Sequence, residues 1–327
     1  MEPGAAVLTW RALTRDDAPA LTRWYAALEA VDDTGEHFSE QDARDQLQDD
    51  GIDLPQDTIA AVDAGGELAA VGWLYGTIAL GGVVPTARGR GLGRRLLEWA
   101  EERVAARQGD AVRVDVHQNN ATKEALVRAA GYEAVRWEHR MSRALDDALP
   151  EVPPTPAGLS LTPYLADRDH AVWRAHVEAF ADHWGAGPPD EQRWAHWFTG
   201  SRAFQPEVSW LVLDGDEVAG YLLTYFWEAD AAGSGVREAF LGQLGVRPPW
   251  RRRGPGGLLI AQGLASYRDA GFERAVLTVD TGNATGALGL YERAGFAVRD
   301  SSVSWTKASG APYADARRSA RTAPKWS

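Results

Sequence analysis

The stretch RRRGPGGLL, residues 251–259, places three arginines beside a glycine-rich turn in a chain of 327 residues with a net charge of −12. A similar stretch, RGRGLGRRLL, stands at residues 88–97. Both share the pattern R-x-x-G-x-G, follow an apolar run that reaches a proline, and precede a pattern typical of an amphipathic helix. The apolar runs are 81–87 and 241–250, and the predicted helices cover 92–107 and 256–270.

The similarity between the two halves continues beyond these turns. Six landmarks occur twice in the same order and at nearly the same spacing, so the chain contains a duplicated domain. Besides the apolar run, the turn and the helix, they are a β-rich segment (111–116 and 274–280), an Asn-Ala pair (Asn120 and Asn283), and the related stretches LVRAAGY (126–132) and LYERAGF (290–296).

The boundary between the halves is a proline-rich segment, PEVPPTPAG, with four prolines among nine residues. Such a segment is typical of a semi-rigid extended linker. The sequence therefore predicts an N-terminal domain at 1–149, a linker at 150–158, a C-terminal domain at 159–306 and a disordered tail at 307–327. We expect each domain to be an α/β unit, with helices on both faces of a mixed, mostly antiparallel sheet.

Composition excludes several classes of function. The chain has no cysteine, so disulfides, cysteine metal sites and a thiol nucleophile are absent. The acidic balance argues against nucleic acid as a partner. Residues 68–87 lack charge, but their glycines and proline predict two strands joined by a turn rather than a membrane span. His170, His176 and His183 lack the spacing of a helical metal pair, and we expect no metal and a cytoplasmic location.

A glycine-rich turn before a helix can bind an anion. The first amides of a helix have no intrahelical partner and lie at the positive end of its dipole. Glycines let several N–H groups converge on one anion, and Pro255 suits the first helical turn. Two phosphates of a nucleotide-like cofactor would suit such a turn, although a glycine-capped helix start beside solvated arginines explains a single stretch of this kind equally well. The spacing differs from a dinucleotide fingerprint, and no Gly-Lys-Ser/Thr follows.

The second half reads V-x-P-x-x-R-x-x-G-x-G from Val246 to Gly256, followed by Asn283 and the L-Y-E-R-x-G-F stretch. This combination resembles the GNAT superfamily of N-acetyltransferases. Two such domains in one chain resemble its tandem, mycothiol synthase-like type. The resemblance implies two tandem GNAT folds and acetyl-CoA as the acyl donor.

The resemblance also implies which residues bind acetyl-CoA. In GNAT domains the fourth strand contacts the pantetheine arm, and the following turn holds the pyrophosphate. In the second half, the implied residues are Leu244, Val246, Arg251, Arg252, Arg253, Gly254, Gly256, Gly257 and Asn283. In the first half, they are Val84, Arg88, Gly89, Gly91 and Gly93.

Two catalytic residues follow from the same resemblance. Tyr291 matches a position near the cofactor sulfur and is the predicted general acid. Glu238, at the start of the presumed fourth strand, is the predicted general base, with Glu228 as an alternative. Val127 occupies the position of Tyr291 in the first half, and valine cannot donate a proton. We therefore expect the first half to be catalytically silent.

Five tryptophans between 173 and 210 offer a wall for an acceptor pocket, although helix-to-sheet packing is the preferred interpretation for Trp173 and Trp210. Trp184 is the preferred pocket candidate, and Asp182, Asp190 and Glu191 could hold an ammonium group. The other tryptophans are Trp173, Trp194, Trp197 and Trp210.

The resulting hypothesis is direct transfer of an acetyl or short acyl group from acetyl-CoA to a primary amine of a small molecule, by a monomer or homodimer. Acetylation of a protein or peptide, and a non-catalytic acetyl-CoA sensor, remain alternatives.

Overall fold

The computed structural model describes residues 7–181, 189–282 and 286–309. The chain divides into two compact units. Unit 1 consists of the described residues up to Arg136 together with those from Ser302 onward, and unit 2 is Trp137–Ser301. Asn283, Trp184, Asp182 and His183 lie outside the described residues, so the predictions that rest on them stay predictions.

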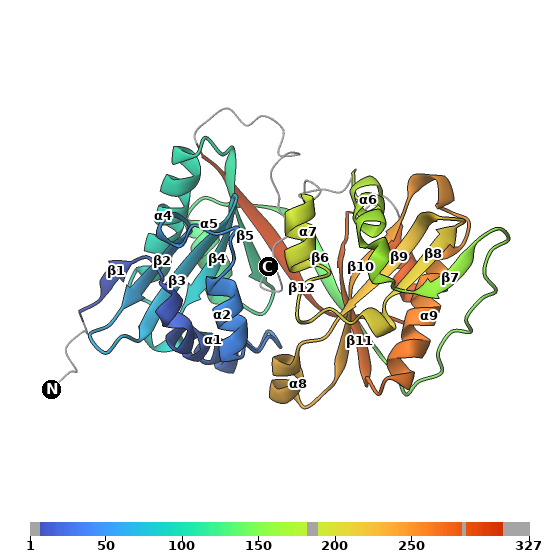
Figure 1. Cartoon of the computed structure of the whole chain (residues 1–327). Helices are drawn as coiled ribbons and strands as arrows, with labels where there is room; N and C mark the ends of the chain where they lie inside the picture. The colour runs from blue at the N-terminus through green and yellow to red at the C-terminus, as the bar shows by residue number, and fades with distance from the viewer. Residues whose placement is uncertain (1–6, 182–188, 283–285, 310–327) are drawn as a thin grey trace. The chain divides into compact units, whose positions relative to one another are not determined.

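In the first half of the chain, a strand is followed by three helices, three strands, a helix, a strand, a helix and a final strand (Figure 1). Its elements are β1 (Thr9–Arg11), α1 (Ala18–Asp32), α2 (Glu40–Leu47), α3 (Leu54–Asp57), β2 (Thr58–Val62), β3 (Leu68–Tyr75), β4 (Ile78–Val83), α4 (Leu92–Ala106), β5 (Ala111–His117), α5 (Ala121–Ala129) and β6 (Glu133–Ala144). The uncharged stretch 68–87 forms β3 and β4, as predicted, with Gly76 in the turn at φ 63°.

The second half repeats this order, except that it has no counterpart of α3 and has one additional short helix, α8. Its elements are β7 (Ser160–Pro163), α6 (Asp169–Ala179), α7 (Glu191–Trp197), β8 (Trp210–Asp214), β9 (Glu217–Tyr225), α8 (Glu228–Ser234), β10 (Glu238–Val246), α9 (Pro255–Asp269), β11 (Arg274–Asp280), α10 (Ala287–Arg293) and β12 (Ala297–Ala308). The strand β12 extends two residues into the segment predicted as a disordered tail.

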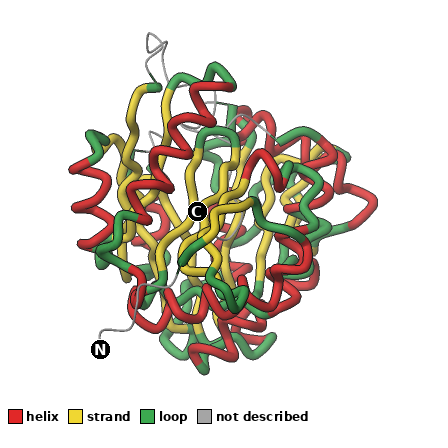
Figure 2. The backbone as a smooth tube through the Cα atoms, turned by 90° about the vertical axis from the view of Figure 1, so that its left-hand side faces the viewer, coloured by secondary structure: helices red, strands yellow, loops and turns green. Residues whose placement is uncertain are grey.

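Each unit is a mixed sheet with helices on both faces (Figure 2). The strand order is β1-β2-β3-β4-β5-β12 in unit 1 and β6-β11-β10-β9-β8-β7 in unit 2. Within each unit the pairs are antiparallel except for one parallel pair, β4–β5 or β10–β11. The predicted fold class is confirmed.

Alternating side chains of the sheets build two cores per unit. In unit 2, Leu222 and Leu241 pack with α9, whereas Tyr221 and Leu223 pack with α6 and α7. In unit 1, Val71 and Trp73 pack with α1 and α2, and Leu74 packs with α4. The helices that follow the two glycine-rich turns therefore cover one face of each sheet.

The final strands of the two halves are exchanged between the units. Residues Ser302–Ala308 of β12 pair with β5 in unit 1, and Glu138–Ala144 of β6 pair with β11 in unit 2. Trp305 of β12 is buried in the unit 1 core, and Lys307 forms a 2.7 Å ion pair with Glu101. Each sheet therefore depends on a strand from the other half of the sequence.

A chain that ends at residue 296 should lose the fold of unit 1. It lacks β12, and removing a buried tryptophan alone costs about 3–5 kcal/mol. Thermal unfolding followed by circular dichroism should lose its cooperative transition for unit 1, whereas a chain that ends at residue 309 keeps all described residues and should retain it. Equal melting of the two chains would contradict the strand exchange.

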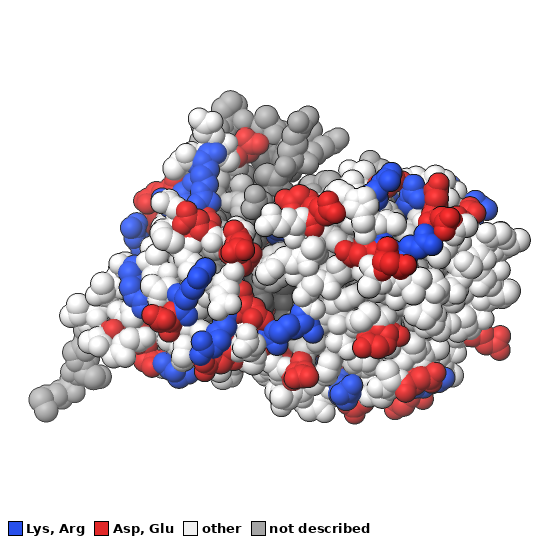
Figure 3. All heavy atoms as spheres, viewed as in Figure 1, with Lys and Arg blue, Asp and Glu red and all other residues white. Residues whose placement is uncertain are grey.

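No helix among the described residues is long and apolar enough to cross a membrane. On the face visible in Figure 3, acidic and basic side chains are interspersed over each unit.

Candidate active site

The two parallel strands of unit 2 separate to form a fork. β10 and β11 pair from Glu238 to Phe240, where Phe240 faces Val276. A β-bulge between Leu241 and Gln243 follows, and beyond it the described part of β10 pairs only with β9. A bulge bends and twists its strand. The backbone from Gln243 to Val246 is therefore available on its β11 side.

Leu244 and Val246 lie on this separated part of β10, where both side chains are half-buried. The predicted contact of their backbone with a pantetheine arm stays a prediction. In unit 1, β4 pairs with β5 only at Ile78 and Arg113 among the described residues, so a second fork opens there. The Val84 N–H, however, donates to Ala69 O at 3.0 Å and is already used within the sheet.

The glycine-rich turn leads directly into α9. Gly254 is the N-cap in the left-handed region (φ 98°), and Pro255 is the first helical residue, as expected. Gly91 has the same role before α4, with φ 81°. Only glycine adopts this conformation without strain, so the local geometry explains both glycines.

The first turn of α9 suits an anionic group. Pro255 has no N–H, and the amides of Gly256 and Gly257 lack intrahelical acceptors by their position. A side chain at Gly257 would meet no atom within 4 Å, so the approach to these amides is open. Arg252 and Arg253 are exposed beside the turn and form no ion pair with a described residue. Amides, helix dipole and guanidinium groups thus converge on a place where a diphosphate could bind.

Arg251 and Arg88 have a structural role instead. Arg251 Nε donates to Val246 O at 3.1 Å, and Nη2 donates to Ala179 O at 2.9 Å. Arg88 Nε donates to Val83 O at 3.1 Å, and Nη2 contacts both carboxylate oxygens of Asp32. In both halves this arginine therefore ties the turn to the preceding strand and to the end of the first helix.

The remaining glycines of the two turns are explained by different structural constraints. A Cβ at Gly256 would lie 3.3 Å from Leu290, and one at Gly93 would lie 2.8 Å from Leu126, so both permit close packing of the next helix. Gly89 adopts φ 74° without strain, whereas its counterpart Arg252 adopts φ 60°. A non-glycine residue with positive φ is uncommon and concentrates at functional sites.

Tyr291 lies on α10, next to the end of the fork marked by Leu290 and Val246. Its side chain is 8% exposed, and its hydroxyl makes no hydrogen bond to another described residue. Burial raises the pKa of Tyr291 to about 12. The phenol is therefore protonated at neutral pH and has a proton to donate.

The corresponding place in unit 1 has no such donor. Val127 on α5 is fully buried in an apolar core. Asn120, the counterpart of Asn283, caps α5 and accepts a hydrogen bond from the Lys123 N–H at 2.9 Å. The turn of unit 1 therefore keeps its glycine N-cap but has no neighbouring phenol.

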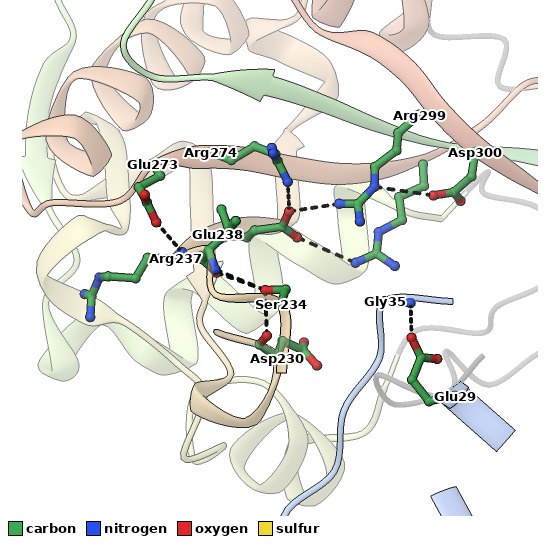
Figure 4. Close-up of polar contacts among 12 residues, drawn as sticks. Glu29, Gly35, Asp230, Ser234, Arg237, Glu238, Glu273, Arg274, Arg299 and Asp300 are labelled. Carbon is green, nitrogen blue, oxygen red and sulfur yellow. Dashed lines mark hydrogen bonds and ion pairs between the residues drawn. The ribbon is translucent and has the colours of Figure 1, made fainter. Parts of the chain in front are cut away.

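Glu238 is 15% exposed and is surrounded by arginines from three strands (Figure 4). Its Oε1 accepts hydrogen bonds from Arg274 on β11 at 2.5 Å and from Arg299 on β12 at 2.8 Å. Arg140 on β6 lies 3.9 Å from Oε2. Accepting a proton would weaken these ion pairs, so the surroundings do not favour Glu238 as a base. The alternative, Glu228, is exposed at the start of α8.

A small pocket opens beside Glu238, at the closed end of the fork. Its lining residues are Arg140, Trp227, Asp230, Ala231, Glu238, Phe240 and Val276. Sequence reasoning missed Arg140 because it belongs to the exchanged strand β6. It missed Asp230 because α8 has no counterpart in the first half. The extra residues between β9 and β10 were the signal that could have found α8.

The described tryptophans of the predicted acceptor wall mostly pack in the interior. Trp194 is fully buried and donates to Asp169 at 2.9 Å, and Trp210 donates to Ser266 at 3.0 Å. Trp173 donates to Pro189 O at 2.8 Å. Asp190 caps α7 by accepting from the Arg193 N–H at 2.7 Å. Helix packing therefore accounts for these three tryptophans.

The two halves both match the model of the acetyltransferase (GNAT) family, at residues 21–132 and 170–296. The chain belongs to the GNAT acetyltransferase family. It is a tandem GNAT protein and an acyltransferase, as predicted.

Relatives support this assignment. The chain is 33% identical to mycothiol acetyltransferase of Salinispora arenicola over 222 residues, which cover 66% of this chain and 68% of that protein. It is 34% identical to mycothiol acetyltransferase of Salinispora tropica over 222 residues, which cover 66% of this chain and 68% of that protein. A GCN5-related N-acetyltransferase from Sphaerobacter thermophilus has a TM-score of 0.71 at 28% identity, covering 92% of this chain and 96% of that chain.

A tandem GNAT protein from the clavulanic acid biosynthesis pathway shares the fold. Its TM-score is 0.67 at 17% identity, over 93% of this chain and 99% of that chain. Since GNAT acetyltransferases generally use acetyl-CoA, the fork and turn are the place to test for this donor.

Proposed function

We propose that unit 2 transfers an acetyl or short acyl group from acetyl-CoA to a primary amine of a small molecule. The observation that carries the proposal is the fork between β10 and β11, which leads to the open amides at the start of α9 and has Tyr291 beside it. The backbone of Leu244 and Val246 would pair with the pantetheine arm. Gly256, Gly257, Arg252 and Arg253 would bind the diphosphate, and Arg251 and Gly254 would shape the turn.

The proposed reaction forms an amide bond and breaks a thioester bond. A protonated amine and acetyl-CoA give the N-acetyl product, the free thiol of CoA and one proton to solvent. With no cysteine in the chain, direct transfer requires no covalent enzyme intermediate. Tyr291 would donate its proton to the departing sulfur and recover one from water.

The acceptor amine and the proposed acid would reach the acyl group from opposite faces of the sheet. The pocket lies on the sheet face that carries Phe240 and Trp227, and Tyr291 belongs to the core on the opposite face. An amine in the pocket would approach the acyl carbon from one face, while Tyr291 would serve the sulfur from the other. Unit 1, with Val127 in place of the phenol, would not catalyse transfer.

The mycothiol acetyltransferases that the chain resembles support a small-molecule acceptor. A small amine, or the amine-bearing end of a larger metabolite, is therefore the proposed substrate.

Thiol release provides the test. With acetyl-CoA and a panel of amino sugars, amino alcohols and amino acids, the full chain should release CoA thiol only when an amine is present, and the product should gain one acetyl group by mass spectrometry. The same panel with a peptide bearing a free N-terminus should react more slowly. Binding of acetyl-CoA without turnover of any amine would contradict the proposal and favour a sensor.

A further inference from the structure

The duplicated fold allows the forks of the two units to be compared residue by residue. Among the described residues, the parallel pairing ends at Arg113 in unit 1 and at Val276 in unit 2. Side chains alternate along a strand, so the next residue on the same face is Asp115 on β5 and Thr278 on β11. Thr278 is exposed, whereas the side chain of Asp115 is only 8% exposed. The fork of unit 2 is therefore open at this position, and that of unit 1 is filled.

Asp115 belongs to a buried polar cluster of unit 1. Arg113 Nε donates to Asp115 Oδ1 at 2.9 Å, and the Ser304 hydroxyl on β12 donates to the same oxygen at 2.5 Å. The second oxygen, Oδ2, is also buried and accepts no hydrogen bond from a described residue. A buried carboxylate is stabilised by neighbouring positive charge. The surroundings of Oδ2 therefore suit a second cation besides Arg113.

Lys123, in the first turn of α5, supplies a positive charge at this fork. It interacts electrostatically with Asp115 on β5 and with Asp32 at the end of α1. Burial lowers the pKa of Lys123, while the two carboxylates act in the opposite direction. The helices α5 and α1 pack on opposite faces of the sheet. A side chain that starts on α5 and interacts with both carboxylates therefore reaches the gap where β4 and β5 have separated.

The matching position in unit 2 is Ala287. Lys123 lies one helical turn before Val127, and Ala287 lies one helical turn before Tyr291. The side chain of Ala287 ends at its Cβ and packs against the core of unit 2. Unit 2 thus has a small residue on the helix where unit 1 has a lysine, and an uncharged residue on the strand where unit 1 has a carboxylate. The two differences belong together, because a buried ammonium and a buried carboxylate stabilise each other.

From this comparison we infer that Lys123 occupies the fork of unit 1, in the place that the pantetheine arm would take in unit 2, so that the chain binds one molecule of coenzyme. The inference rests on the proposed donor site of unit 2 and goes beyond it by assigning a role to Lys123 and Asp115. A pantetheine arm carries no charge. Inserting it between β4 and β5 would separate the ammonium from its carboxylates, and the cost of leaving buried charges unpaired opposes binding. The Arg88–Gly93 turn then serves unit 1 as a helix start.

Counting the bound coenzyme tests this inference without turnover. Native mass spectrometry and calorimetric titration of the full chain with coenzyme A should both give one molecule per chain. Gly254→Glu should abolish this binding, whereas Gly91→Glu, the same change at the turn of unit 1, should leave the Kd within about threefold of the native value. Two molecules per chain would overturn the inference. A single site that is lost in Gly91→Glu and kept in Gly254→Glu would overturn it as well.

Exchange of the fork residues tests the role of Lys123 itself. In the Gly254→Glu background, Lys123→Ala combined with Asp115→Thr removes both buried charges together and gives unit 1 the residues of unit 2. This variant should bind coenzyme A with a Kd at least about tenfold lower than that of Gly254→Glu alone. Lys307→Ala is the matched control, because it removes a lysine of unit 1 that pairs with Glu101 instead. In the same background it should gain no affinity.

The outcomes separate this inference from the proposed function. If the exchanged variant melts cooperatively, like its parent, and gains no affinity, Lys123 does not close the fork and the inference is wrong. Should the exchange impair folding, the count of coenzyme molecules on the native chain still decides. One molecule bound in unit 2 without acetylation of any amine would refute the proposed function and leave the inference intact. Two bound molecules with acetylation of an amine would do the reverse.

Discussion

Gly254→Glu is expected to abolish binding of acetyl-CoA to unit 2. The substitution places a carboxylate at the N-cap of α9, beside the amides proposed to hold the diphosphate, and it puts a side chain at φ 98°. Such backbone strain costs about 1–3 kcal/mol, and the added negative charge opposes an anionic ligand. Calorimetric titration should show at least about a hundredfold increase in Kd for the unit 2 site, equivalent to about 2.7 kcal/mol.

Gly271→Glu is the matched control for this variant. Gly271 also has positive φ (76°) and open space around it, but it follows the C-terminal end of the same helix. The Gly271→Glu variant has a side chain at positive φ and an added carboxylate, but both lie away from the first turn. The affinity of this variant for acetyl-CoA should therefore remain within about threefold of the native value. Equal loss of affinity in both variants would mean that helix destabilisation, and not the turn, explains the effect.

Tyr291→Phe should lower kcat without weakening acetyl-CoA binding. The phenylalanine keeps the packing against Phe296 but cannot donate a proton to the leaving sulfur. General acid catalysis contributes about 10²–10⁴-fold, so a fall in kcat of about 100-fold or more is expected, with Kd for acetyl-CoA nearly unchanged. Turnover close to the native rate would remove Tyr291 as the acid.

Tyr267→Phe serves as the control for loss of a buried phenol. The Tyr267 and Thr224 hydroxyls form a 2.7 Å hydrogen bond in the same core. Loss of this hydrogen bond should cost about 1 kcal/mol of stability and leave kcat essentially unchanged.

Because burial raises the pKa of Tyr291 to about 12, the phenol of Tyr291 keeps its proton below that value. The acid should therefore stay active up to about pH 10.

Local signals made the turns predictable. The sign of φ at Gly91 and Gly254 and the fixed φ of Pro255 depend on single residues, so the start of both helices could be located from the sequence. The duplication doubled that signal. Alignment of the two halves also shows that Val127 occupies the position of Tyr291.

Nonlocal pairing could not be predicted in the same way. The final strands of the two halves carry no local feature that decides which sheet each joins, since β6 and β12 alternate similarly. The partners of Glu238 come from three strands, and Arg140 reaches it from the first half of the sequence. The prediction of Glu238 as a base came from the family resemblance, whereas its ion pairs with these arginines depend on the three-dimensional arrangement.

The central claim is that the turn from Arg251 to Gly257 in unit 2 holds the diphosphate of the acyl donor. A crystal structure of the full chain grown with coenzyme A tests it most directly. The account predicts diphosphate density against the Gly256 and Gly257 amides, with the pantetheine arm between β10 and β11. Diphosphate density only at the Arg88–Gly93 turn, or away from both turns, would contradict it.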